Sequence, residues 1–457
     1  REGKRVYGVN TGFGKLSKTI IPKEKLQQLQ HNLLHSHAAG VGEPLADEVS
    51  RAALLFKINS LLWGHSGVRK EIIFYLLELL NQKAYPIIPS KGSVGSSGDL
   101  APLAHLALIL IGEGEAKLNG KVLSGREVLR RLRLEPLELE PKEGLALING
   151  TQVTLALGFI GFLRAQNLLN NAQVVAALAV EALGGSVEPF DERIQSCHLH
   201  RGQGEVAANM RRLLHRSKLV CTDTSDVQDP YTLRCIPQVL GASADALEFV
   251  KEKLEIEMNS ATDNPLIFPE TGEVLAGGNF HGQILSFAME LLGMAAAEIG
   301  SFSERRIALL LSSPTLPEFL VKDSGLNSGL MLPQYTAAAL VAENKVLAHP
   351  SAVDSIPTSG GKEDHNSLAT VSAHKALKII ENVEYILAIE LLTAAQALDF
   401  RESSKMAVAT REAYNLCRSK IAHLEEDRIL SQDIEAARRI IQTCQLAIMA
   451  GLSNATT

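Results

Sequence analysis

The sequence predicts a mainly α protein built around a long central helix bundle with small β-hairpin excursions. The clearest sign is an apolar stripe with three- and four-residue spacing in the segment 366–400, at Leu377, Ile380, Val383, Leu387, Leu391, Ala394 and Leu398. A second sign is a run of small residues at 293–297, which permits close contact between helices. Because no linker, repeat or low-complexity segment divides the chain, we expect one continuous architecture.

Composition limits the kind of partner. The 457 residues carry a formal charge of −6, and 46% are hydrophobic, so the chain can bury a large core. The absence of a Lys/Arg cluster argues against nucleic acid or an anionic membrane as partner and favours a small-molecule ligand. Five widely spaced cysteines without a C-x-x-C pair indicate a reduced, intracellular protein. Apolar runs shorter than the roughly 18 to 20 residues that span a bilayer indicate a soluble, cytoplasmic one.

The first 82 residues predict a loop followed by helices. Residues 6–18 contain three glycines and should form a mobile loop with Tyr7 at its edge. Three helical patterns follow, at 23–39, 47–63 and 68–82. The first of these ends in His35 and His37, whose i, i+2 spacing points to different helix faces and disfavours a joint metal site.

A hairpin and a long helix are expected next. The pair Asn119-Gly120 is a strong two-residue turn signal and predicts a hairpin over 116–124. A helical pattern then begins near Lys142 and continues to about Leu183, with the polar group Asn149-Gly150-Thr151-Gln152 inside it. Buried amides are costly unless they are paired, so we expect either a structural hydrogen-bond network or a ligand at this group.

The remaining chain predicts the bundle itself. Helical patterns cover about 228–259, 283–311, 335–347 and 366–400, and a second hairpin over 264–278 turns at Thr271-Gly272. Helices that are apolar on most sides imply a bundle buried inside an oligomer. We therefore expect a single unit, with a loop-rich active-site part at about 1–220, the bundle at about 221–400 and C-terminal helices at about 401–457.

The segment Lys91–His105, KGSVGSSGDLAPLAH, is a tight loop that leads into a helix. Asp99 is a candidate N-cap, and Pro102 is tolerated in the first helical turn. A phosphate cradle would need the G-x-x-x-x-G-K-[ST] pattern, and Asp99 would repel the phosphate. A serine hydrolase would need a strand before its G-x-S-x-G elbow, and this chain shows no such sheet.

A third possibility is a reaction of the loop backbone. The amide nitrogen of Gly98 can attack the carbonyl carbon of Ser96, and loss of water then closes a five-membered ring. Loss of the Ser97 hydroxyl as a second water leaves an exocyclic methylidene group, which is a strong electrophile. Glycine suits the nucleophilic position because it has no Cβ and tolerates the dihedral angles that cyclisation requires.

Seven ordered motifs resemble those of the aromatic amino acid ammonia-lyase and aminomutase family. They are YGVNTGFG, GSVGSSGDLAPLAH, NGTQ, QDPYTLRC, GGNFHG, ENKVLAHPSAVDSIPTS and KEDHNS. SHAAG at 36–40, Phe280-His281 and EDH at 363–365 are most similar to the histidine ammonia-lyase branch. The resemblance implies a fumarase/aspartase-like architecture and a homotetramer whose active sites are shared between subunits.

The resemblance also implies a prosthetic group, 4-methylidene-imidazol-5-one. It would form autocatalytically from Ser96, Ser97 and Gly98, without an external cofactor or a metal. The amine of the substrate, or alternatively its ring, would add to this group, and the nitrogen would become a better leaving group. Tyr7 would be the base that removes the β-proton, for which its pKa must fall below the ordinary phenol value of about 10.

Further roles implied by the resemblance concern the substrate. Arg234 would hold the substrate carboxylate as a bidentate pair, although a surface charge is the usual fate of an arginine. Asn149, Gln228 and Tyr231 would form hydrogen bonds to the carboxylate or to the prosthetic ring.

The side chain of the substrate would be recognised by three other residues. Phe280 would pack against the substrate, and His37 would help to select its side chain. Glu363 would accept a proton or a hydrogen bond from the amine or the imidazole, and a carboxylate suits an imidazole better than a phenyl ring.

The chain departs from the family pattern at four places. Ser96 stands where alanine is usual, and since cyclisation uses only its backbone carbonyl, we expect the ring to form. Lys362 replaces a common glutamine, and Gln283 replaces the glutamate that the histidine branch often has. The family also usually has further residues before the Tyr7 motif, which indicates a truncated or processed N-terminus. The substitutions at Lys362 and Gln283 affect the substrate assignment more than the reaction assignment.

The leading functional hypothesis is deamination of L-histidine to trans-urocanate and ammonia. A phenylalanine or tyrosine ammonia-lyase, or an aminomutase of the same family, is the alternative. A non-enzymatic helical scaffold is the hypothesis from a different class. A mass deficit of two waters at residues 96–98 would separate the enzyme from the scaffold.

Overall fold

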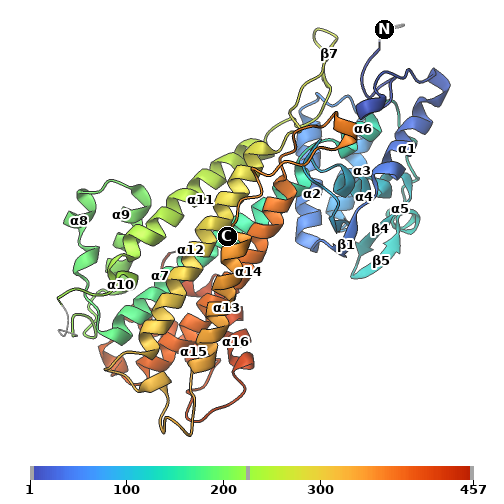
Figure 1. Cartoon of the computed structure of the whole chain (residues 1–457). Helices are drawn as coiled ribbons and strands as arrows, with labels where there is room; N and C mark the ends of the chain where they lie inside the picture. Colours follow the sequence, from blue (N-terminus) through green and yellow to red (C-terminus); the bar gives the residue numbers. More distant parts are fainter. Residues whose placement is uncertain (1–4, 223–226, 453–457) are drawn as a thin grey trace. The chain divides into compact units, whose positions relative to one another are not determined.

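The computed structural model describes residues 5–222 and 227–452, and helices dominate them (Figure 1). Within these ranges seventeen α-helices accompany seven short strands, so the predicted mainly α class is confirmed. Contacts divide the chain into two compact units. Unit 1 comprises Arg1–Ile160, Lys251–Glu290 and Pro350–His374, and unit 2 comprises Gly161–Val250, Leu291–His349 and Lys375–Thr457. The single-unit organisation expected from the sequence remains a prediction.

The helices of the first 150 residues lie in unit 1. They are α1 (Leu26–His37), α2 (Asp47–Leu62), α3 (Lys70–Asn81), α4 (Leu100–Leu108), α5 (Gly125–Leu132) and α6 (Glu143–Ile148). The three helices predicted over 23–82 are confirmed to within three residues at each end. Their apolar faces are buried, as at Leu34 of α1, Leu54 of α2 and Leu76 of α3, all of which are fully buried.

Three small antiparallel sheets complete unit 1. They pair β1 (Val41–Pro44) with β3 (Pro89–Lys91), β4 (Glu115–Leu118) with β2 (Tyr85–Pro86) and β5 (Lys121–Ser124), and β6 (Leu266–Phe268) with β7 (Glu273–Leu275). Asn119 and Gly120 both have positive φ, at 51° and 76°, which is the geometry of a two-residue hairpin turn. Both predicted hairpins are therefore confirmed.

The single helix predicted from Lys142 to Leu183 is wrong. The structure has two helices, α6 and α7 (Gln152–Leu183), separated by an extended break. Asn149 has φ −85° and ψ 128°, and Gly150 has φ 132°. The carbonyl oxygen of Gly150 accepts a hydrogen bond from the amide of Asp99 at 2.7 Å, so the break exchanges helical bonds for bonds to another loop.

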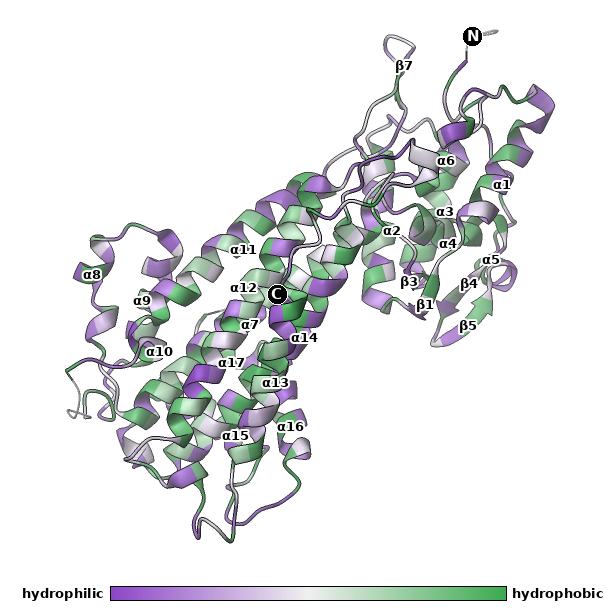
Figure 2. Ribbon diagram, viewed as in Figure 1, coloured by the Kyte–Doolittle hydropathy of each residue, from purple (hydrophilic) through white to green (hydrophobic). Residues whose placement is uncertain are grey.

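Unit 2 contains a bundle of long helices. It includes parts of α7, α11 (Ile236–Met258), α12 (Gln283–Leu311) and α14 (Ala369–Leu398), and the shorter α8 (Glu192–Ser196), α9 (Arg201–Leu213), α10 (Tyr231–Arg234), α13 (Met331–Leu347), α15 (Val408–Arg418), α16 (Leu430–Gln442) and α17 (Gln445–Met449). Figure 2 shows hydrophobic residues along the whole length of α12 and α14. A Cβ added to Gly293 would lie 3.2 Å from Ile379, which confirms that small residues permit close helix contact here.

Helix α12 contains a long apolar stretch. By length and composition it could cross a membrane, although the sequence runs did not indicate such a helix. However, 61% of its most apolar 18-residue window is buried in the fold. Arg306 near its end is fully buried and donates to Glu390 of α14 at 2.9 Å, which is the character of a core helix in a bundle.

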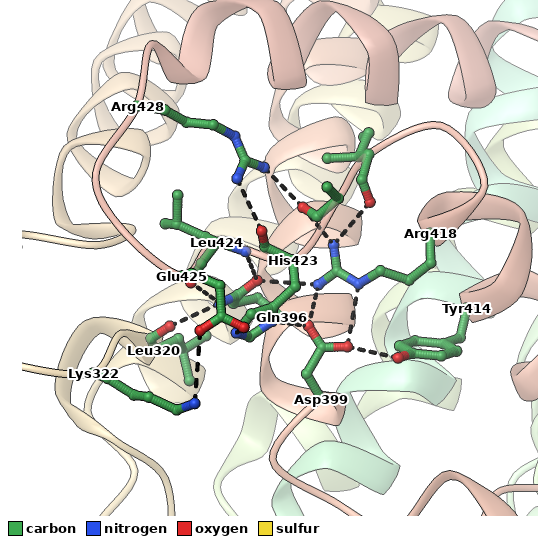
Figure 3. Close-up of polar contacts among 12 residues, drawn as sticks. Leu320, Lys322, Gln396, Asp399, Tyr414, Arg418, His423, Leu424, Glu425 and Arg428 are labelled. Atoms are coloured by element: carbon green, nitrogen blue, oxygen red, sulfur yellow. Dashed lines mark hydrogen bonds and ion pairs between the residues drawn. The ribbon is translucent and has the colours of Figure 1, made fainter.

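A polar cluster joins the ends of α14 and α15 in unit 2 (Figure 3). We name it the Asp399 cluster, and it consists of Asp399, Gln396, Tyr414, Arg418 and His423. Asp399 accepts hydrogen bonds from Arg418 Nη2 and from the Tyr414 hydroxyl, both at 2.6 Å, and contacts the ring of His423. Burial, with the Asp399 hydrogen bond and charge, raises the pKa of Tyr414 to about 12. The cluster therefore attaches the segment 419–424 to the end of α14.

Candidate active site

The loop that the sequence singled out is anchored in unit 1 on both sides. The hydroxyl of Ser93 donates to the carbonyl oxygen of Gly98 at 3.3 Å and accepts from the amide of Gly95 at 3.1 Å. On the other side, the amide of Leu368 donates to the carbonyl oxygen of Val94 at 2.9 Å. Hydrogen bonds therefore hold the loop within itself and to the residue before α14.

Glycine is required at position 98 by both conformation and space. Gly98 has φ 73°, in the left-handed region that favours glycine. A Cβ at this position would lie 2.1 Å from the carbonyl oxygen of Gly150, closer than any real contact. The backbones of Gly98 and Gly150 also form a parallel bridge. The backbone nitrogen of Gly98 thus has no side chain to hinder its approach to a neighbouring carbonyl.

Asp99 occupies the N-cap position of α4, as predicted, but its carboxylate does not cap the helix. Instead it accepts hydrogen bonds from the amide and the hydroxyl of Thr154, both at 2.7 Å, and from the hydroxyl of Thr370 at 2.9 Å. Burial raises the pKa of Asp99, and these hydrogen bonds oppose the rise. The capping expectation is wrong because Asp99 ties the loop to α7 and α14 through residues that both belong to unit 1.

Asn149 connects the break after α6 with the loop. Its Nδ2 donates to the carbonyl oxygen of Ser97 at 3.1 Å, while its Oδ1 is buried without a partner among the described residues. The next residues form a structural network, because Thr151 donates to Glu257 at 2.5 Å and Gln152 donates to Thr262 at 2.7 Å. The hydrogen-bond network expected for this polar group is therefore confirmed, and a ligand at the free Oδ1 of Asn149 stays a prediction.

A cavity of about 540 Å³ opens beside the loop. Its lining brings together five residues that the sequence nominated, namely Tyr7, His37, Ser97, Asn149 and Glu363. Apolar side chains such as Leu29, Leu33 and Leu145 cover much of the rest. This volume suits a ligand of amino acid size with one ring.

Tyr7 lies half-buried on the cavity wall, with its ring edge-on to Phe13 at 6.3 Å between centroids. Its hydroxyl oxygen accepts a hydrogen bond from the amide of Gly14 at 3.2 Å. Burial and the charge of Glu363 raise the pKa of Tyr7, and only the Gly14 amide lowers it. In the single chain the pKa of Tyr7 is therefore raised and not lowered, and its role as the base stays a prediction.

Glu363 and His37 supply polar groups to the same cavity. Glu363 Oε1 accepts from the hydroxyl of Ser97 at 3.4 Å, and its Oε2 accepts from the hydroxyl of Thr358 at 2.9 Å. His37 ends α1, and its Nδ1 lies 3.0 Å from the hydroxyl of Ser36. Burial lowers the pKa of His37, which favours its neutral imidazole. A carboxylate and a neutral imidazole can together bind a polar heterocycle.

The other nominated residues lie elsewhere. Phe280 is half-buried in the turn before α12 and is outside the lining of this cavity. Gln228, Tyr231 and Arg234 belong to unit 2, where Arg234 stacks on the Tyr231 ring at 4.7 Å and contacts Gln228. The Nε of Arg234 is buried without a partner among the described residues. Ser96 is half-buried beside Ser97 in the loop.

Several residues of the site could not be nominated from the sequence. Asn32 and Ser36 line the cavity from α1, five residues and one residue before its end. Asn32 stands in no motif, and Ser36 was noted only as the first residue of SHAAG, without a role. Lys57 of α2 is fully buried behind Asn149, and a lysine within an otherwise apolar helical face was the signal that could have identified it. Thr154 and Thr370 hold Asp99 but belong to helices that the sequence could not pair.

Comparison with known proteins agrees with this geometry. The family described as aromatic amino acid lyase matches residues 1–419. Histidine ammonia-lyase of Natranaerobius thermophilus is 52% identical over 95% of this chain and 87% of its own length. The crystal structure of histidine ammonia-lyase from Trypanosoma cruzi has a TM-score of 0.90 and 43% identity, covering 98% of this chain and 85% of that one. Tyrosine aminomutase from Streptomyces globisporus has a TM-score of 0.94 and 38% identity, covering 100% and 91%. The chain belongs to the aromatic amino acid lyase family.

Proposed function

We propose that this protein catalyses the non-oxidative deamination of L-histidine to trans-urocanate and ammonia. The reaction breaks the Cα–N bond, removes one proton from Cβ and forms the Cα=Cβ double bond, so it needs no oxidant. The observation that carries the proposal is the meeting of Ser97, Asn149, Tyr7, His37 and Glu363 at one cavity. Similarity to histidine ammonia-lyases over nearly the whole chain supports histidine over phenylalanine or tyrosine as substrate.

We infer that the electrophile is 4-methylidene-imidazol-5-one, formed from Ser96, Ser97 and Gly98. Its formation removes two waters, one on closure of the Gly98 nitrogen onto the Ser96 carbonyl carbon and one from Cα–H and the hydroxyl of Ser97. The residues fit this group, because Gly98 lacks a Cβ in a crowded turn and Asn149 already donates to the Ser97 carbonyl. When formed, the group supplies an electrophilic carbon that takes up the substrate amine and makes nitrogen a leaving group.

Tyr7 is the proposed base for the β-proton. Its hydroxyl lies on the wall of the cavity that holds Ser97, and the Gly14 amide stabilises its phenolate form. Because burial and Glu363 raise its pKa, a positive charge must approach Tyr7 in the working complex. The cationic group of the substrate beside Glu363, or a residue of an assembled neighbour, can provide that charge.

Glu363 and His37 are the proposed recognition groups for the imidazole ring. The Glu363 carboxylate can accept the ring N–H, and the neutral His37 can donate to or accept from the other nitrogen. A phenyl ring would desolvate both groups without offering either of them a hydrogen bond, which costs about 1–3 kcal/mol for each polar group that loses its water. This difference favours histidine over phenylalanine.

Gln228, Tyr231 and Arg234 are proposed to bind the substrate carboxylate in a homotetramer whose active sites are shared between subunits. Arg234 has no carboxylate partner among the described residues, and its Nε is buried and free. Unit 2 also exposes large apolar side chains, among them Met294, Leu332, Tyr335 and Val346. Such side chains favour association between copies of the chain. We assign the enzyme to the cytoplasm, since all five cysteines are free thiols.

Turnover of an amino acid panel tests the proposal. L-Histidine, L-phenylalanine and L-tyrosine are supplied separately, and the conjugated acid product is followed by its ultraviolet absorbance. We expect the highest kcat/KM for L-histidine, with equimolar ammonia. Activity on L-tyrosine without activity on L-histidine would reject the substrate, and a β-amino acid product would identify an aminomutase.

A further inference from the structure

Lys57 is a fully buried cation that the proposed reaction does not use. It lies on α2 with only 1% of its surface exposed. Its Nζ donates to the carbonyl oxygen of Ala146 at 2.7 Å and to that of Asn149 at 2.9 Å. These oxygens belong to the last turn of α6 and to the residue that follows it, where a helix leaves carbonyl groups without intrahelical partners. The ammonium group therefore caps the C-terminus of α6.

The capped segment is the same one that touches the loop. Asn149, whose carbonyl Lys57 holds, donates from its side chain to the carbonyl oxygen of Ser97. The following residue, Gly150, accepts from the amide of Asp99 at 2.7 Å. Residues 149–150 are thus held from one side by Lys57 and contact the reactive triad from the other.

The charges around Lys57 show that its ammonium is held by a balanced group of buried ions. Lys142 is also fully buried and donates to Asp263 at 2.6 Å. Burial lowers the pKa of Lys57 to about 8; the charge of Lys142 lowers it too, whereas Asp263 and Asp99 raise it. At neutral pH the group is charged, although desolvation of a cation opposes folding. An apolar side chain at this position would leave the carbonyl oxygens of Ala146 and Asn149 without this donor.

We propose that Lys57 is a positioning residue for the reactive triad, whose ammonium group fixes the Asn149 backbone so that the Asn149 amide stays on the Ser97 carbonyl. The inference rests on the proposed function, because it concerns formation of the electrophile from residues 96–98. Loss of water from Ser97 requires removal of its Cα proton, which is adjacent to the carbonyl that Asn149 polarises. A donor held on that carbonyl oxygen stabilises the negative charge that develops there. Lys57 acts on this step only through Asn149.

Three variants of the purified 457-residue chain test the proposal. Lys57→Met removes the charge and its hydrogen bonds, Lys57→Arg retains a charged donor, and Lys142→Met removes the other buried lysine without touching Asn149. Intact-protein mass spectrometry measures the fraction of chains that lack two waters, and circular dichroism checks folding. We expect this fraction to fall about tenfold in folded Lys57→Met, with cyclised chains lacking only one water. Lys57→Arg should recover most of the fraction, and Lys142→Met should remain near the wild type.

The outcomes separate this inference from the proposed function. If the wild-type chain lacks no water, the electrophile itself is contradicted. If the wild-type chain lacks two waters and folded Lys57→Met does so to the same extent, the positioning role is overturned. An equal loss in Lys142→Met and Lys57→Met would also overturn it, because the buried charge cluster would then act as a whole.

A pH profile decides the question even if Lys57→Met does not fold. We expect the rate at which newly synthesised wild-type chains lose the second water to decline above about pH 8, where Lys57 loses its proton. Arginine remains protonated throughout this range, so the decline should move to higher pH in Lys57→Arg. Identical alkaline limbs in the two proteins would contradict the proposal.

Discussion

The side-chain amide of Asn149 donates to the carbonyl oxygen of Ser97 at 3.1 Å, although 52 residues separate the two in the chain. This contact places the polar break between α6 and α7 against the loop that carries Ser96, Ser97 and Gly98. The same break meets the loop again where Gly150 accepts from Asp99. Residues 149 and 150 therefore hold the backbone of the proposed triad on both sides of Gly98.

Substitution of Gly98 by alanine should abolish loss of water from the triad. The new Cβ would lie 2.1 Å from the carbonyl oxygen of Gly150, and φ 73° is strained for alanine. Gly120→Ala is a matched control, because Gly120 has φ 76° but no atom within 4 Å of the added Cβ. Intact mass should show the full-weight chain for Gly98→Ala and the lighter chain for Gly120→Ala. A lighter Gly98→Ala chain would refute the steric argument.

Substitution of Tyr7 by phenylalanine should stop proton abstraction while leaving the triad chemistry intact. We expect kcat/KM to fall by about 10²–10⁴-fold, the usual contribution of a general base. Because the pKa of Tyr7 is raised, the wild-type kcat/KM should increase with pH on the acidic side of its optimum. Tyr75→Phe removes a hydroxyl that donates to Glu135, outside the cavity, and should leave turnover unchanged. Normal turnover by Tyr7→Phe would exclude Tyr7 as the base.

The pH dependence of stability should reveal the buried charge of Lys57. Its pKa is about 8 in the folded chain and near 10.5 in the unfolded chain, so between these values the unfolded state binds more protons. The free energy of unfolding of the wild type, relative to Lys57→Met, should therefore rise from pH 8 to 10.5. The expected gain is on the order of 3 kcal/mol, measured by urea titration at each pH. Parallel curves for the two proteins would show that Lys57 is not a buried ammonium.

Removal of Arg418 should destabilise the chain by leaving Asp399 without its cation. The two side chains are only 13% and 12% exposed, and we expect a loss on the order of 3 kcal/mol in the free energy of unfolding. Arg193→Met breaks a similar bidentate pair with Asp191, but Arg193 is 90% exposed, so that variant should unfold as the wild type does. Equal free energies of unfolding in urea for the Arg418 variant and Arg193→Met would mean that the Asp399 cluster does not stabilise the folded chain.

Local patterns were sufficient to predict most elements. The stripe from Leu377 to Leu398 predicted α14, and Asn119-Gly120 predicted its hairpin, because each signal depends only on near neighbours in the sequence. The break at Asn149 could not be predicted in the same way, since Gly150 leaves the helix to bond Asp99, which is distant in sequence. The capping role of Asp99 failed for the same reason, as Thr154 and Thr370 offer its carboxylate better donors.

The residues of the candidate site could also be predicted only in part from the sequence. Motifs with a recognised order nominated Tyr7, His37, Asn149 and Glu363, and the structure brings these four to one cavity with Ser97. Their pKa values depend on burial and on neighbours, so the raised pKa of Tyr7 was beyond the reach of sequence. Lys57 was missed because its role depends on two carbonyl oxygens that lie 89 and 92 residues along the chain.

The central claim concerns the triad, and intact-protein mass spectrometry with peptide mapping tests it most directly. The purified wild-type chain should be lighter than its sequence by two waters, and the deficit should map to the peptide that contains Ser96, Ser97 and Gly98. Ser96→Ala should retain the deficit, because only the backbone carbonyl of Ser96 takes part, whereas Ser97→Ala should lose it with nearly all turnover. An unmodified mass in an active wild-type enzyme would contradict the account.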